Sequence, residues 1–99
     1  MDMIISSQRY IDQSIVDDKI KNSDYVVRFV WITIDGVAVR HIVDGHHSYA
    51  AAKLAGVSPE WEICDSTQQE ADSMDLDSYL ESHYIDSDWY DIETGHLIF

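Results

Sequence analysis

Residues 25–56, YVVRFVWITIDGVAVRHIVDGHHSYAAAKLAG, decide the fold. Val, Ile and aromatic residues fill Tyr25–Ile34 and Val37–Val43, a composition typical of β-strands. The dipeptide Asp35-Gly36 between them favours the positive φ angles of a tight type I′ turn, so we predict a β-hairpin. Both strands are apolar at most positions, which indicates that both faces of the hairpin are covered.

A loop, Asp44-Gly45-His46, leads from the hairpin into a predicted alanine-rich helix over His47–Ala55. Gly56 is placed to end this helix, because glycine adopts the left-handed conformation found after many helices. A strand that turns through glycine into a helix presents unpaired backbone N–H groups and the positive end of the helix dipole. Both features favour an anion, so the turn is a candidate phosphate site.

Weaker signals predict the elements on either side of this centre. Apolar periodicity indicates helices and strands, and the capping-box spacing of Thr67 and Glu70 indicates a helix start. The expected elements are a helix over residues 10–22, a strand over Trp61–Cys64, a helix starting at Thr67, a helix over residues 74–84 and an edge strand over His96–Phe99.

The composition describes one acidic domain over residues 1–99. Its 99 residues leave room for one core but not for two, and a chain that is 45% hydrophobic and 11% aromatic can fold. It has 6 Lys and Arg against 19 Asp and Glu, a formal charge of −13. Such a charge repels phosphate backbones, so we expect no direct binding to nucleic acid. No apolar run approaches the roughly eighteen residues of a membrane span, so we expect no membrane contact.

The single cysteine, Cys64, bears on the compartment. It cannot form an internal disulfide, which fits a reducing environment, and we expect it to be a small buried apolar residue. The N-terminal sequence does not have the pattern of a secretory signal. We therefore expect a cytoplasmic protein.

Charge divides the chain in two. Residues 1–53 contain seven acidic and six basic residues, whereas residues 54–99 contain twelve acidic residues and no Lys or Arg. Aromatic and aliphatic residues alternate with these acids, so this half should fold and hold its carboxylates in fixed places. It is either a solvated face or an electrostatic lure for a basic protein. The candidate partner-binding residues are Asp72, Asp75, Asp77, Glu81, Asp86, Asp88, Asp91 and Glu93.

The stretch Ile42–Gly56 resembles the central motif of the ParB/sulfiredoxin-like superfamily. In that motif an apolar strand leads through Asp-Gly-His-His-Arg and an aromatic residue into an alanine-rich helix. Ile5–Gln8 is similar to the opening strand of such domains, and the flanking elements follow in the family's order, over about two-thirds of the chain. The resemblance implies an α+β fold, with a mixed sheet around the central hairpin, packed helices, a ParB-like core over residues 1–64 and an acidic helical extension over residues 65–99.

The resemblance also implies a nucleotide-phosphate pocket formed by Gly45, His46, His47 and Ser48. Members of the superfamily include partition proteins that bind and hydrolyse CTP, sulfiredoxins that use ATP, and free-serine kinases. The chain departs from the motif at Ser48, which replaces the phosphate-binding arginine and cannot supply its charge. It departs again at His46, which stands where sulfiredoxins have their nucleophilic cysteine.

Two functions from different classes follow. The first is an acidic binding protein that engages a basic, nucleic-acid-handling protein, as small phage or plasmid inhibitors of host defence do. Its carboxylates would imitate the phosphates of DNA. This interpretation ranks first because of the charge asymmetry and the missing arginine.

The alternative is a nucleotide-dependent phosphotransferase or nucleotide hydrolase that uses the Asp44–Ser48 turn. ATP or CTP would bind with Mg²⁺, which would supply the charge that Ser48 lacks. Asp44 would hold the metal or a hydroxyl group, and His46 or His47 would act as acid or base. No resident metal site is predicted, because neighbouring residues rarely converge on one ion without a distant ligand.

Overall fold

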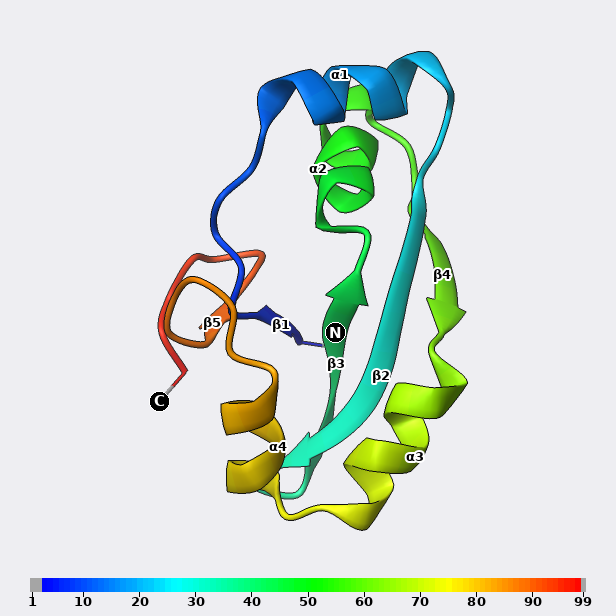
Figure 1. The fold of residues 1–99 in the computed structure, drawn as a ribbon. Helices are drawn as coiled ribbons and strands as arrows, with labels where there is room; N and C mark the ends of the chain where they lie inside the picture. Colours follow the sequence, from blue (N-terminus) through cyan, green and yellow to red (C-terminus); the bar gives the residue numbers. More distant parts are fainter. Residues whose placement is uncertain (1–2, 99) are drawn as a thin grey trace.

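A long hairpin forms the centre of the computed structural model, which describes residues 3–98 (Figure 1). Strands β2 (Val26–Ile34) and β3 (Val37–Asp44) pair in antiparallel fashion along nearly their whole length. Asp35 and Gly36 between them have φ angles of +50° and +80°. Two successive positive angles are what a type I′ turn needs, so the predicted hairpin is confirmed.

Three short strands complete a five-stranded mixed sheet in the order β4-β2-β3-β1-β5. Strand β1 (Ile4–Ser6) is parallel to β3, and β4 (Glu60–Ile63) is parallel to β2. Strand β5 (Tyr90–Asp91) pairs with β1 in antiparallel fashion. The strand predicted at Trp61–Cys64 therefore exists, one residue earlier than expected.

Helices α1 (Gln13–Lys21) and α2 (His46–Ala55) pack against each other at the top of Figure 1. Tyr49 of α2 joins a buried cluster with apolar residues of β1, β2 and β3. Helix α2 ends at Gly56 as predicted, and it begins one residue earlier than expected. Helix α1 is shorter than the predicted residues 10–22, because Asp12 caps its N-terminus.

Helices α3 (Asp65–Ser73) and α4 (Leu76–Ser82) lie at the other end of the molecule and cover the opposite face of the sheet. Side chains alternate between the two faces of a strand, so Val30 and Ile32 point away from α2. They pack against Tyr79, Leu80 and Trp89 from the acidic half of the chain. Residues 65–98 therefore contribute to the same core as residues 3–64, and packing does not separate the two segments.

Two predicted boundaries in the acidic half are wrong. The Cys64 N–H donates to the Phe29 carbonyl at the end of β4, and the chain then enters α3 directly at Asp65. Thr67 consequently lies inside the first turn of α3 and is not its cap. Cys64 is half-buried at this junction, so the expectation of a buried cysteine is also wrong.

The expected edge strand at residues 96–99 is wrong as well. Tyr90 and Asp91 take the position beside β1, and Leu97 forms only an isolated bridge to Tyr90. Phe99 lies outside the described residues. The domain is thus an α+β fold in which the described residues form four helices and a five-stranded mixed sheet.

Candidate functional site

The Asp44–Ser48 turn connects β3 to α2, and its shape depends on Gly45. This residue has a φ of +91°, and a Cβ atom built on it would lie 2.6 Å from the carbonyl oxygen of Val26. Only glycine allows β2 and the start of α2 to approach so closely. Gly45 therefore has a packing role that does not depend on a phosphate ligand.

The side chain of His46 points into the protein. It is buried, and its Nε2 lies 2.6 Å from the Oγ of Ser6 in β1. Removal from water lowers the pKa of His46 to about 4, with a further contribution from neighbouring His47. His46 is thus a neutral histidine at neutral pH that joins α2 to β1.

The two residues after His46 also make internal contacts. The Asp12 backbone N–H donates to Nε2 of His47 over 3.1 Å, which joins α2 to the start of α1. Ser48 is buried, and its hydroxyl assists Lys19 in lowering the pKa of Asp24. His46 and Ser48 would have to give up these interactions before they contacted a phosphate. The ATP or CTP pocket at this turn therefore stays a prediction, and it would have to use the backbone N–H groups at the start of α2.

Asp44 is the exposed member of the turn. Its Oδ1 accepts a hydrogen bond from the Gly45 N–H over 2.9 Å, so the carboxylate stabilises the local turn. Across residues 3–98, no group of three or more His, Cys, Asp and Glu side chains is arranged to hold a metal ion. None of the helices in this range is long and apolar enough to cross a membrane.

The eight acidic residues predicted to bind a partner are exposed, apart from half-buried Asp91. Three of them, Asp77, Glu81 and Asp88, make no side-chain hydrogen bond to another described residue. The other five accept hydrogen bonds within the protein, and these bonds fix the positions of their carboxylates. The five are Asp72, Asp75, Asp86, Asp91 and Glu93.

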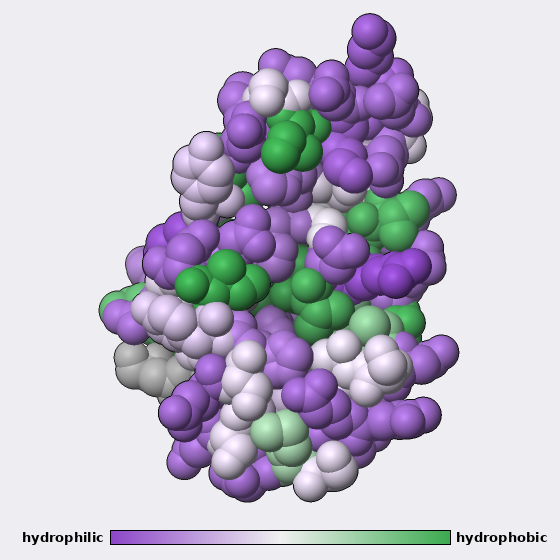
Figure 2. Space-filling model, viewed as in Figure 1, coloured by the Kyte–Doolittle hydropathy of each residue, from purple (hydrophilic) through white to green (hydrophobic). Residues whose placement is uncertain are grey.

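The carboxylates are unevenly distributed in space. We call residues 65–82, which span α3 and α4, the α3–α4 surface; they include six acidic residues and no Lys or Arg. Three of the six basic residues, Lys19, Lys21 and Lys53, belong to α1 and α2 at the opposite end (Figure 1). Hydrophilic side chains form most of the outline of the molecule, whereas hydrophobic ones gather in separate patches (Figure 2). The α3–α4 surface therefore carries acidic residues without a basic residue of its own.

Comparison with known proteins does not identify a relative. No family model, no curated protein and no solved structure matches this chain. The similarity of Ile42–Gly56 to the ParB/sulfiredoxin-like motif stays a prediction.

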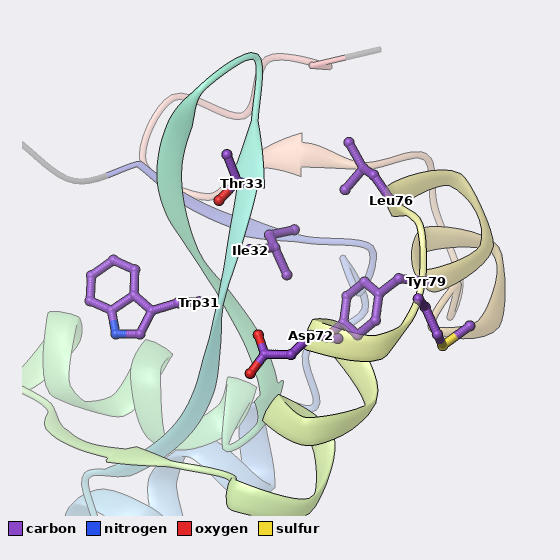
Figure 3. Close-up of a pocket in the computed structure, with 8 residues that line it drawn as sticks. Trp31, Ile32, Thr33, Asp72, Leu76 and Tyr79 are labelled. Atoms are coloured by element: carbon purple, nitrogen blue, oxygen red, sulfur yellow. The ribbon is translucent and has the colours of Figure 1, made fainter.

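Sequence reasoning did not find a cavity of about 190 Å³ between β2 and the α3–α4 surface (Figure 3). The sequence does contain one indication of this cavity, namely the difference in length between two predicted strands. The predicted strand over residues 25–34 is more than twice as long as its neighbour over residues 61–64. Part of one strand edge is therefore left without a partner strand, and such edges need another covering.

Proposed function

We propose that this protein is an acidic binding protein that engages a basic, nucleic-acid-handling protein. The observation that carries the proposal is the α3–α4 surface, whose six carboxylates lie on α3, on α4 and on the residue that caps α4; Tyr79 and Leu80 anchor α4 in the core, and partly buried Ala71 packs α3 against it. Carboxylates on an ordered support lose less conformational freedom on binding than carboxylates on a flexible tail. Their combined field attracts a basic partner from a distance.

The mode of action that we favour is inhibition by imitation of DNA. Carboxylates accept the same charge-assisted hydrogen bonds from Arg and Lys that phosphates accept, so this surface can compete with nucleic acid for a basic site. We propose that this protein belongs among the phage or plasmid anti-defence proteins that act in the cytoplasm. We propose a ParB-like scaffold whose phosphate turn has lost its arginine, since Ser48 stands at that position and is buried.

A displacement experiment tests the function. Purified basic DNA-binding proteins are each bound to fluorescein-labelled duplex DNA, and this protein is added while anisotropy is followed. We expect it to release the DNA from at least one of them, less effectively at about 200 mM salt than at about 50 mM. Absence of release across the panel at low salt would contradict the proposal.

A pair of double variants shows which surface acts. Replacing Asp77 and Glu81 by Asn and Gln removes two charges from the α3–α4 surface, and we expect weaker displacement. Replacing Asp17 and Asp18 of α1 by Asn removes the same charge at the other end of the molecule. Equal losses in both double variants would mean that only net charge matters.

A further inference from the structure

The cavity between β2 and the α3–α4 surface combines apolar walls with a carboxylate. Ile32, Met74, Leu76 and Tyr79 contribute apolar surface, and the Asp72 carboxylate is directed toward β2 (Figure 3). Trp31 also lines the cavity, although its indole is directed to the other side of β2 (Figure 3). The space of about 190 Å³ is therefore bounded by the sheet on one side and by two helices on the other.

One edge of β2 passes this cavity without a partner strand. Strand β4 pairs with β2 only as far as Phe29 and Ile63. Beyond that point the Gln68 side chain accepts a hydrogen bond from the Trp31 N–H over 2.7 Å and donates one to the Trp31 carbonyl over 2.9 Å. Alternate residues of a strand direct their peptide groups to the same edge, so the next carbonyl that faces the cavity is that of Thr33.

Gln68 also positions the carboxylate. Its Nε2 donates to Oδ1 of Asp72 over 3.0 Å, and Oδ2 makes no hydrogen bond to another described residue. The cavity thus has two acceptors, Oδ2 of Asp72 and the carbonyl of Thr33, and one backbone donor, the Thr33 N–H. Apolar walls with acceptors beside them fit a long side chain that has an aliphatic stem and a cationic end.

We propose that this cavity receives an arginine side chain of the basic partner; the inference rests on the proposed function and gives it an anchor point. The stem packs against Met74 and Leu76, while the guanidinium group donates to Asp72 and Thr33. A planar guanidinium presents several N–H donors in fixed directions and so reaches two separate acceptors at once, which a lysine ammonium does less well. The other carboxylates of the α3–α4 surface favour the same cation.

Peptides that differ in one side chain test the anchor. The isotope-labelled protein is titrated with the acetylated and amidated tripeptide Gly-Arg-Gly and with its lysine and citrulline counterparts, followed by NMR. We expect the arginine peptide to shift the amide signals of Thr33 and Asp72 and the methyl signal of Met74. Binding of the lysine peptide should be about threefold weaker, and the citrulline peptide, which is neutral and similar in shape, should not bind.

Two single variants separate the cavity from the general field. Asp72→Asn keeps an oxygen for Gln68 but removes the charge, and we expect arginine-peptide binding to weaken about tenfold. Asp77→Asn removes one charge from α4 outside the cavity lining and should weaken binding less than about twofold. If Asp72→Asn fails to fold, the citrulline peptide makes the same comparison from the ligand side.

The outcomes distinguish this inference from the proposed function. If both variants lost arginine-peptide binding equally, or if the peptide shifted the NMR signals of all acidic residues evenly, the arginine site would be overturned even though DNA displacement persisted. Arginine-specific binding in the cavity without DNA displacement would overturn the proposed function and retain the anchor. Selective binding together with displacement would support both.

Discussion

Gly45 shows how one missing side chain permits the junction between β3 and α2. In Gly45→Ala, the new methyl group would lie 2.6 Å from the Val26 carbonyl oxygen on a backbone with a φ of +91°. We expect a loss of about 3 kcal/mol in the free energy of unfolding, from strain and overpacking together. Urea denaturation of the wild type and the variant measures this loss.

Gly56→Ala is the matched control for this prediction. Gly56 also has a positive φ, +71°, but a Cβ atom there meets nothing within 4 Å. Only the conformational strain remains, so the loss should be about 1 kcal/mol. Similar losses at both glycines would show that the contact with Val26 costs nothing.

Two buried histidines make stability depend on pH. Nδ1 of His41 lies 2.6 Å from the Tyr79 hydroxyl oxygen. Burial lowers the pKa of His41 to about 3 and the pKa of His46 to about 4. Below about pH 6.5 the unfolded chain protonates both histidines and the folded chain does not. Stability should therefore fall as the pH is lowered from about 6.5 toward 4, by up to about 1.4 kcal/mol per pH unit for each histidine.

Urea denaturation at a series of pH values checks this dependence in the wild type and in His46→Gln. The variant lacks one of the two groups, so its stability should fall less steeply over the same range. The pKa values of Asp12, Asp24, Asp75 and Glu93 are lowered by hydrogen bonds, so the stability that these carboxylates contribute is lost only below about pH 4, the ordinary value of a carboxyl group. The prediction fails if wild type and variant have the same slope.

Among the helices, α4 gives a clear test of a cap. The Asp75 carboxylate accepts a hydrogen bond from the Ser78 N–H, whereas Asp77 lies in the first turn without a capping bond. Asp75→Ala should lower the free energy of unfolding by about 1 kcal/mol, and Asp77→Ala by a few tenths. Thermal denaturation of both variants measures the difference, and equal effects would contradict a capping role.

Elements with local signals were predictable, and elements fixed by distant partners were not. The Asp35-Gly36 turn and the alanines before Gly56 specify the hairpin and α2 without reference to the rest of the chain. Strand β5 is two residues long and exists because β1 lies beside it. The start of α3 depends on a hydrogen bond from Cys64 to β2. Neither of these partners, β1 for β5 and β2 for Cys64, can be identified from the residues next to the element that it fixes.

The candidate site shows the same division. Charge counting correctly placed the acidic residues at the surface, because isolated carboxylates are rarely buried. The burial of His46 and Ser48 depends on β1 and α1, which the local motif does not contain. The cavity beside Asp72 depends on the unequal lengths of β2 and β4. Residue types were therefore easier to predict than the contacts that give them a role.

At the scale of the whole molecule, the acidic half is needed for folding. Tyr79, Leu80 and Trp89 share a core with the hairpin, so a fragment of residues 1–64 would expose one face of its sheet to water. We expect this fragment to lack cooperative unfolding and dispersed amide signals, whereas the full chain has both. A fragment that unfolds cooperatively would show instead that the first 64 residues form an independent unit.

The amide of Gln68 also bears on how the protein resists self-association. A bare strand edge is a template onto which a second copy can add, and repeated addition produces fibrils. Gln68 occupies both backbone groups of Trp31 and so blocks that growth point with one side chain. Spontaneous deamidation to Glu would remove the donor and place a new charge beside Asp72. The Trp31 carbonyl would then lose its partner, and protection of this edge would pass from hydrogen bonding to the repulsion between neighbouring carboxylates.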